Sequence, residues 1–463
     1  MYYTSQRRFK VICLLLIAVG GLLLGFCCTW EKPKQKEVYF PKLDNYADLY
    51  LRGTYDVLHM IRVRELEKIG AACKIAAQCK LNGGKIVSRI GTPHIMYAGA
   101  CEKCEKDVPG NPNIAYEPNS RNPDYDKIPD LGEGDFLIIA GPRFPEAREN
   151  GCFVLGVGYP MSTNRYSPPG FNDHPDIPME SLVDMMIYTW GPKEDGIVTP
   201  ALTPHLKICP TSPMTVVAYW LIMAQIAHNL VYEDTSGTFD AAKEYIDILM
   251  NRLDLFHERY IGEMDLIGEM IADRVLSGGK IYPWSSRWEF YQEASGTAGS
   301  VMGIFPIHPN GFYTGPGPHY PPEFNPDDLT NKDVVLLAMA GSTPDIEIEM
   351  ARKIREKGVF MVGIYPFERE DGFSTAPLGE LCDVSLDNLS GDMDGVLNIS
   401  GYPHKIIPTV AMMNNFAFWS IIGAYVQNMG KRGEAPYYWM SWHVPGGKAY
   451  TDSVHVHFLR RGY

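Results

Sequence analysis

One short segment of the chain combines small residues, hydroxyl groups and a helix start, and this combination can bind a phosphate group. It reads Gly341-Ser342-Thr343-Pro344-Asp345 and follows an apolar run that is typical of a buried strand. The glycine permits close approach of the backbone, the hydroxyls can donate to anionic oxygens, and the proline suits a first helical turn. Backbone N–H groups and the positive end of the helix dipole would then meet the anion. Alternatively, Ser342 or Thr343 only caps the helix.

Two other segments place hydroxyl groups where they could meet the same anion. Ser285 and Ser286 follow an apolar run, and Arg287 beside them could contribute a guanidinium or lie solvated on the surface. Thr409 precedes a long apolar segment, so it could add a hydroxyl at a second helix N-terminus or serve only as a cap. The sequence therefore offers three candidate ligand-binding segments.

The chain repeats its own pattern about 198 residues apart, which predicts two copies of one domain. In each copy an Asp-Gly pair, a Pro-His pair and a Pro-Thr pair follow one another and run into a long apolar segment. The matched segments are 83–87 with 278–282, 135–140 with 333–338, 151–157 with 358–364, and 195–211 with 394–409. Because these elements recur in order at a nearly constant offset, a duplicated domain is favoured over a short solenoid repeat.

Expected strands alternate with expected helices in both copies, which is typical of an α/β fold with parallel sheets. The apolar runs suit strands that are covered on both faces. The expected strands are 85–88, 136–140, 153–157, a segment near 281, 334–338 and 360–364. The expected helices are 145–150, 214–230, 239–255, 263–276, 346–357 and 410–429, with helix also around 55–77. The sequence thus predicts two tandem doubly wound α/β/α sandwiches with central parallel sheets.

The second copy carries a set of motifs that together resemble one known family. They are Gly278-Gly279-Lys280-Ile281 and the segments 333–345, 349–358, 381–388, 403–409 and 436–447. This set resembles the sugar isomerase (SIS) domain, and the second copy is similar to uncharacterised phosphosugar-binding SIS proteins over nearly all of 255–455. The first copy resembles the same fold more weakly, with Gly91-Thr92-Pro93-His94 in place of the family's loop after the first strand.

The resemblance implies that the chain binds a sugar or sugar phosphate, and that its two modules pair as an internal pseudo-dimer, in a monomer or a homo-oligomer. A sugar-phosphate isomerase works through an enediol-type intermediate, so it needs a carboxylate or an imidazole to move a proton between adjacent carbons. The resemblance would place the carboxylate at Glu289 or Glu293, and His404 or His205 could carry a proton near neutral pH. The glutamates could instead be solvated, and the repeated Pro-His could be a structural corner.

The sequence departs from the family pattern in the phosphate loop. The family usually places serines just before the glycine, whereas Ala338 and Ala340 stand there. The corresponding segment of the first copy, 140–144, has no hydroxyl, although Arg143 could supply charge. These losses favour a second hypothesis, in which the chain is a non-catalytic scaffold or sensor that binds glycan or cell-wall fragments, or acts as an assembly module.

Residues 11–30 contain no charged side chain and follow a basic stretch at 7–10, which predicts a membrane-spanning helix with a cytoplasmic N-terminus. The segment could instead be a cleaved signal peptide, or a lipoprotein signal at Cys27 or Cys28. Each alternative places the bulk of the chain outside the cytoplasm. The expected organisation is an anchor or signal at 1–30, a tether at 31–50, SIS-like domains at 51–232 and 239–432, and a C-terminal tail at 433–463.

The net charge and the cysteine spacing limit which kinds of ligand the chain is expected to bind. A net charge of −13 and a pI near 5.4 argue against nonspecific binding to nucleic acid, which requires a basic surface. Cys101 and Cys104 form a lone C-x-x-C without a second pair to complete four ligands, so neither a metal site nor a cofactor is predicted. Outside the cytoplasm these two cysteines could close a small disulfide loop.

Overall fold

The computed structural model describes most of the chain, and the statements below refer to that part. The described residues are 45–90, 114–116, 130–140, 145–159, 178–192, 196–234, 236–286, 290, 294, 297–305, 326–340, 344–392, 395–402, 404–441 and 444–463. We call the part up to Asp234 the first half and the part from Asp240 onward the second half. The expected membrane segment and the pair Cys101 and Cys104 lie outside the described residues.

The first half contains a parallel sheet with the strand order β2-β1-β3-β4-β5. Its strands are β1 (Ile86–Ile90), β2 (Ile114–Tyr116), β3 (Phe136–Ala140), β4 (Phe153–Gly158) and β5 (Met185–Tyr188). The three strands expected here from the sequence are confirmed as β1, β3 and β4. Their side chains alternate between two hydrophobic clusters, so the sheet is covered on both faces, as its apolar runs predict.

The second half contains a parallel sheet with the order β11-β10-β9-β8. Its strands are β8 (Ile281–Trp284), β9 (Val334–Ala338), β10 (Phe360–Tyr365) and β11 (Val384–Asp387). Beyond β8, Ile304 forms a single parallel bridge to Ile281, in the place that β2 occupies beside β1. The α/β class with parallel sheets is therefore confirmed, and the strands of the two halves follow the same order.

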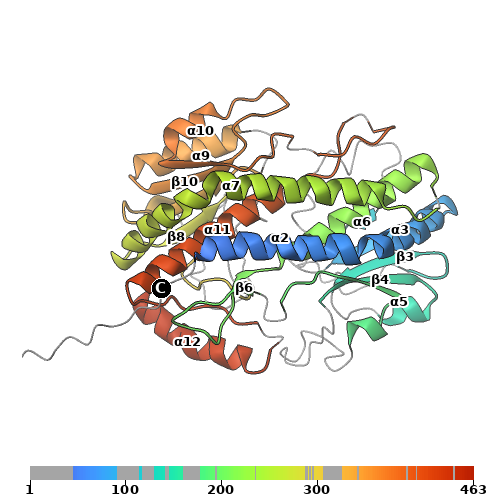
Figure 1. The fold of residues 1–463 in the computed structure, drawn as a ribbon, viewed down its shortest axis with the longest axis horizontal. Coiled ribbons are helices and arrows are strands. Elements are labelled where there is room, and N and C mark those ends of the chain that lie inside the picture. Colours follow the sequence, from blue (N-terminus) through green and yellow to red (C-terminus); the bar gives the residue numbers. More distant parts are fainter. Residues whose placement is uncertain are drawn as a thin grey trace, which may run out of the picture. The chain divides into compact units, whose positions relative to one another are not determined.

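Helices lie on both faces of each sheet (Figure 1). They are α2 (Tyr46–Arg64), α3 (Leu66–Leu81), α5 (Pro145–Glu149), α6 (Pro213–Tyr232), α7 (Asp240–Leu276), α9 (Asp345–Glu356), α10 (Ala376–Leu381), α11 (Val410–Lys431) and α12 (Gly447–Arg461). Two short 3-10 helices, η2 (Met179–Ser181) and η3 (Pro326–Asp328), lie in connections. The helices expected at 145–150, 214–230, 346–357 and 410–429 are confirmed as α5, α6, α9 and α11.

The two halves also share positive backbone φ angles between the final strand of each sheet and the long helix that follows it, α6 or α11. Trp190 and Leu389, each just after the final strand of its sheet, have φ of 55° and 59°. Cys209 and Ile407, which lie shortly before α6 and α11, have φ of 60° and 65°. We call α6 and α11 the closing helices of the two halves. Residues other than glycine rarely adopt this left-handed conformation, because Cβ then crowds the backbone. An antiparallel pairing precedes the closing helix in both halves, between β6 (Gly196–Val198) and β7 (Ile208–Pro210) and as the Leu397–Ile406 bridge.

The first helix of each half packs against the other half. Helix α2 lies beside α7 and contacts α11, while α7 also contacts α6 of the first half (Figure 1). The backbone N–H of Tyr46 donates to Oε1 of Gln427 at 2.9 Å, inside the protein. One hydrophobic cluster includes Phe136 and Leu155 of the first sheet together with Val334 and Val362 of the second. The two halves therefore share a core.

Three elements differ from their sequence-based expectation. Helix α7 runs unbroken for 37 residues where two helices separated at 256–262 were expected, because its buried stripe continues through Tyr260. That packing outweighs the cost of about 1 kcal/mol for Gly262 in a helix interior. Helix α2 begins at Tyr46 and buries it, so residues 46–50 belong to the fold and not to the expected tether. Helix α12 lies in the segment expected to be a tail.

Among the described residues, α6 is the one helix that is long and apolar enough to cross a membrane. Its most apolar stretch is 78% buried within the protein, where it packs against α3 and α7. Burial of this kind accounts for an apolar helix without a membrane, since a helix that is hydrophobic all round also forms the centre of a large core.

Candidate functional site

The three candidate binding segments follow β8, β9 and the last antiparallel pairing of the second half. In a parallel sheet the carboxyl ends of all strands meet at one edge, and ligands of open α/β sheets bind there. Ser285 and Ser286 directly follow β8. The expected phosphate loop of Gly341, Ser342 and Thr343 follows β9, but these residues lie outside the described part, as does Glu293. The described neighbours of the loop are Ala340 before it and Pro344 after it.

A hydrogen bond joins two of the candidate segments. The hydroxyl of Ser286 donates to Oε1 of Glu347, which lies in the first turn of α9, just after the expected phosphate loop. Ser285 and Glu347 are both fully buried. The β8 segment and the start of α9 are therefore in direct contact, as a shared ligand site would require.

Glu347 is a buried carboxylate that sequence reasoning missed. Glu347 lies at the carboxyl edge of the sheet, in the first turn of α9. Glu289 and Glu293 are the carboxylates that the family resemblance indicates for proton transfer, and Glu347 is not among them. The signal was present in the spacing: Glu347, Ala351 and Ile354 are separated by four and three residues and are all buried on one face of α9. A glutamate in register with the apolar positions of a helix is a candidate for a buried, functional acid.

Thr409 lies in a buried network and not on an open surface. Its side chain is 1% exposed, and its Oγ1 accepts a hydrogen bond from Nη1 of Arg252 and lies 3.2 Å from the Ser390 hydroxyl. The guanidinium of Arg252 also forms two bonds to the carboxylate of Asp392, at 2.9 and 2.5 Å. Thr409 makes no side-chain hydrogen bond to the helix that it precedes. The expected cap is therefore absent, and the hydroxyl helps to tie α7 to the start of α11.

Buried amides extend this network to β9. The Asn388 side chain donates to Oδ1 of Asn414 at 2.8 Å, and Nδ2 of Asn414 donates to the backbone carbonyl of Met339 at 2.8 Å. All these side-chain groups have partners in a region of low dielectric, where such bonds hold their geometry firmly. The carboxyl edge of the second sheet is thus fixed before any ligand binds.

The equivalent edge of the first half has different chemistry. There the buried carboxylate of Glu65 accepts hydrogen bonds from the Trp190 indole at 2.8 Å and from the Tyr188 backbone at 3.2 Å. At Gly191, a Cβ atom would lie 2.5 Å from Oγ1 of Thr211, so no side chain like that of Ser390 fits. The first half therefore carries different residues at the positions that form the network of the second.

His404 lies on an exposed turn between the bridged residues Leu397 and Ile406. Its neighbour Lys405 forms an ion pair with Glu370, in the loop after β10. The exposed His205 of the first half packs the edge of its ring against Tyr450, with centroids 6.0 Å apart. The two histidines have different surroundings, and neither shares a described hydrogen bond with Ser285, Ser286 or Thr409.

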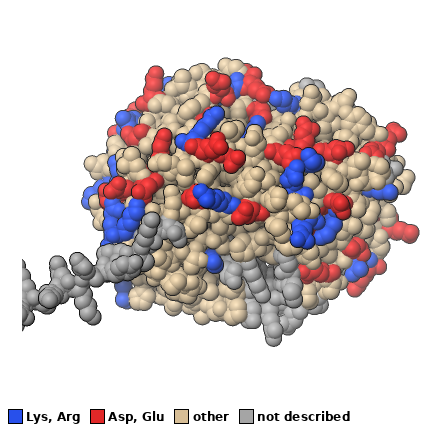
Figure 2. Space-filling model, viewed as in Figure 1, with Lys and Arg blue, Asp and Glu red and all other residues tan. Residues whose placement is uncertain are grey.

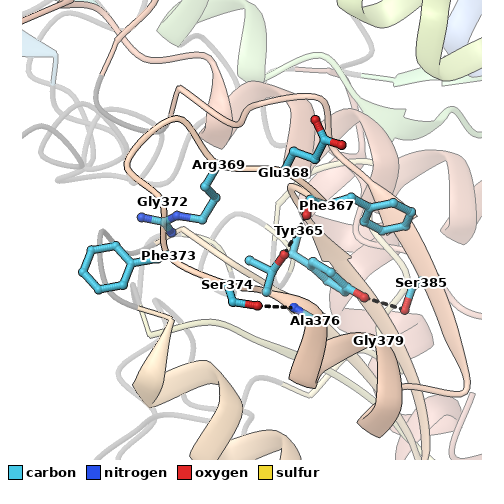
Figure 3. A pocket seen from close by; sticks show the side chains of 11 residues that line it. Tyr365, Phe367, Glu368, Arg369, Gly372, Phe373, Ser374, Ala376, Gly379 and Ser385 are labelled. Atoms are coloured by element: carbon cyan, nitrogen blue, oxygen red, sulfur yellow. Dashed lines mark hydrogen bonds between the residues drawn. The ribbon is translucent and has the colours of Figure 1, made fainter.

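The loop after β10 borders a pocket of about 670 Å³ (Figure 3). Its lining includes Tyr365, Phe367, Glu368, Arg369, Phe373 and Ser385. Nη1 of Arg369 lies 3.7 Å from Sδ of Met339, so the pocket adjoins the end of β9. No local sequence pattern indicates this pocket, because its walls come from β10, β11, α10 and the loop between β10 and α10.

Charges of both signs are interspersed on the face drawn in Figure 2. Across α2 and α7, for example, Arg62 and Lys243 both pair with Asp247. This face carries no continuous basic surface of the kind that holds a phosphate backbone.

No protein-family model matches the sequence. No curated protein matches it either. Among solved structures, the chain is similar to a proposed phosphosugar isomerase from Silicibacter pomeroyi, with 13% identity, a TM-score of 0.45, and coverage of 85% of this chain and 100% of that one. It is also similar to the C-terminal domain of glucosamine-fructose-6-phosphate aminotransferase from Francisella tularensis (11% identity, TM-score 0.42, 84% and 97% covered). A third is the tagatose-6-phosphate ketose/aldose isomerase from Escherichia coli (11% identity, TM-score 0.41, 85% and 93% covered).

Proposed function

We propose that this chain is a tandem SIS-type protein that binds a phosphorylated sugar at the carboxyl edge of its second sheet. The hydrogen bond between Ser286 and Glu347 is the observation that carries the proposal. It brings the segment after β8 against the start of α9, the helix that the expected phosphate loop precedes. Backbone N–H groups at such a helix start, together with nearby hydroxyls, are the groups that bind a phosphate dianion.

Glu347 gives this site the group that an isomerase needs. A carboxylate that removes the proton from C2 of an open-chain aldose phosphate and returns it to C1 would pass through an enediol and yield the ketose. The hydrogen bond from the Ser286 hydroxyl holds one oxygen of the buried carboxylate in place, and a base held in place transfers protons faster than a freely moving one. In this proposal Glu347 takes the role that the sequence analysis gave to Glu293.

A thermal-shift screen with hexose 6-phosphates, amino-sugar phosphates and their unphosphorylated counterparts tests the binding proposal. A ligand at a hundred times its Kd raises the free energy of unfolding by roughly 2.7 kcal/mol. We expect a phosphate-dependent rise that disappears in the double variant Ser342→Ala, Thr343→Ala. Ser453→Ala, which removes an exposed hydroxyl from α12, is the matched control and should keep the rise. Equal shifts in both variants would remove the loop from the site.

The alternative is a non-catalytic scaffold or sensor for glycan or cell-wall fragments, or an assembly module. It is supported by the engagement of Ser286 and Thr409 in contacts within the protein. The loss of serines at Ala338 and Ala340 supports it too. No thermal shift with any sugar phosphate at saturating concentration would favour this alternative.

We also propose that residues 1–30 anchor the protein in a membrane, with the bulk of the chain outside the cytoplasm. The uncharged run at 11–30 and the basic stretch before it support this topology. Protease treatment of intact cells tests it, because an external domain is digested and an internal one survives. The packing of α2 on α11 supports an internal pseudo-dimer of the two domains, proposed at 51–232 and 239–432.

A further inference from the structure

We infer that the pocket beside β10 is a second carbohydrate subsite, which holds an uncharged pyranose ring next to the proposed phosphate site. The inference rests on the proposed function for its ligand class. It names the ligand more closely, as a saccharide of at least two rings with its phosphate on one ring only.

Two exposed phenyl rings flank the pocket. Phe367 and Phe373 are 46% and 50% exposed, and Figure 3 shows them on opposite sides of the pocket. The face of an aromatic ring carries partial negative charge, so it attracts the slightly positive C–H groups on the flat side of a pyranose. Tyr365 continues the aromatic wall, with its ring centroid 5.3 Å from that of Phe367. Aromatic walls with a few polar groups are the usual composition of a small-molecule site.

The charges of the pocket disfavour a phosphate and suit hydroxyl groups. Arg369 is paired with Asp371, through a 2.9 Å bond from Nε and a second contact from Nη2. The exposed Glu368 forms no ion pair within the described part of the chain. A carboxylate without a cation repels a dianion but accepts hydrogen bonds from sugar hydroxyls. The ring that enters this pocket is therefore the one without the phosphate.

The pocket loop is held in place from several sides. The buried Thr375 hydroxyl donates to the backbone carbonyls of Pro366 at 2.8 Å and Phe367 at 3.1 Å. The Tyr365 hydroxyl donates to Ser385 on β11 at 2.8 Å. At Gly379, a Cβ atom would lie 3.3 Å from the Tyr365 oxygen, so the glycine keeps this wall open. Because the loop is already fixed, little conformational entropy is lost when a ligand binds. A neutral sugar ring can therefore bind even though it makes few strong contacts.

The position of the pocket links it to the proposed phosphate site. Arg369 lines the pocket and contacts the sulfur of Met339, which is two residues before Gly341 in the sequence. A volume of about 670 Å³ lies within the usual range for ligand sites, roughly 300–1,000 Å³. A ligand with one ring at the end of β9 and the next ring in the pocket would occupy both places.

Calorimetric titration of the full chain tests the subsite with two kinds of probe. The neutral probes are cellobiose, maltose and N,N′-diacetylchitobiose, with uracil as a planar non-carbohydrate; the charged probes are hexose 6-phosphates and glucosamine 6-phosphate. We expect at least one neutral disaccharide to bind, and the double variant Phe367→Ala, Phe373→Ala to weaken it about tenfold or more, as the loss of two aromatic contacts predicts. Tyr232→Ala, which removes another exposed aromatic ring, should leave binding unchanged.

The outcomes separate this inference from the proposed function. If sugar phosphates bind but no neutral disaccharide does, or if the phenyl double variant binds the disaccharide as the wild type does, the subsite is overturned and the proposed function stands. Binding of uracil in place of the disaccharides overturns the carbohydrate assignment. If a disaccharide binds through the phenyl rings while no sugar phosphate binds, the subsite stands and the phosphate site falls.

Discussion

Gly268 of α7 lies so close to Ala424 of α11 that a Cβ atom on the glycine would be 2.4 Å from the Ala424 carbonyl carbon. The atoms it would meet are mostly backbone, which cannot turn aside as the end of a flexible side chain can. This approach brings together α7, which contacts helices of both halves, and α11, which is buried from Val410 to Gly430.

We expect Gly268→Ala to lower the free energy of unfolding by about 1–3 kcal/mol, the usual cost of overpacking a core. Gly262→Ala on the same helix is the matched control, because a Cβ there meets nothing within 4 Å. Alanine at that position should stabilise by about 0.5–1 kcal/mol through helix propensity. Urea unfolding of both variants measures the difference, and equal effects would contradict the close packing.

Glu347→Gln should separate chemistry from binding. Glutamine keeps an oxygen that can accept from the Ser286 hydroxyl, but it cannot take up a proton, so aldose–ketose conversion should fall by about 10²–10⁴-fold. The Kd for the sugar phosphate and the unfolding temperature should change little. Glu356→Gln at the exposed end of α9 should leave the rate unchanged. A variant that converts the sugar at the wild-type rate would exclude Glu347 as the proton carrier.

Asp234, in the turn between the halves, should make stability sensitive to acid. Hydrogen bonds from Ser236 and Thr238 lower the pKa of Asp234 to about 2, well below the value of about 3.9 in an unfolded chain. Its contribution is therefore complete above the unfolded value and is lost as the pH falls towards 2. We expect Asp234→Ala to cost about 1 kcal/mol at pH 7 and progressively less as the pH falls through about 2.

Chemical unfolding at a series of pH values measures the difference in free energy of unfolding between the wild type and Asp234→Ala. Asp130→Ala removes an exposed carboxylate before β3 and serves as its control. A difference between wild type and Asp234→Ala that did not shrink in acid would argue against the charged turn.

The described cysteines should resist alkylation in the folded protein. Burial raises the pKa of Cys79 to about 11 and that of Cys152 and Cys382 to about 12, and it raises the pKa of Cys73 and Cys209 further. Since the thiolate is the reactive form, iodoacetamide at pH 8 should label these five positions slowly before unfolding and rapidly after it. Peptide mass spectrometry measures each position separately, and rapid native labelling of Cys382 would contradict the raised pKa of its thiol.

The sequence predicted the elements whose own pattern is strong and missed those that depend on neighbours. The apolar runs at 136–140 and 334–338 are typical of buried strands, and the structure confirms them. The strand Val384–Asp387 at the sheet edge is short and carries Ser385 and Asp387, so it has no such run. Its partner β10 stabilises it, which a local pattern cannot reveal.

The candidate site follows the same rule. Ser285 and Ser286 could be found because they follow an apolar run, and Glu347 could have been found from its spacing to Ala351. Arg252 could not, because it lies 157 residues before the Thr409 hydroxyl that it contacts. Its role depends on how α7 packs against α11, and nothing local to the arginine encodes that packing.

The packing of α2 on α11 also determines when the chain can finish folding. Tyr46 leaves the ribosome early, yet its hydrogen-bond partner Gln427 is 381 residues further along the chain. Helix α2 also contacts α7, but the surface that it packs against α11 stays uncovered until α11 has been synthesised. Such a long delay exposes nascent chains to aggregation. Synthesis of this protein is thus expected to depend on chaperones that shield α2 until α11 has been synthesised.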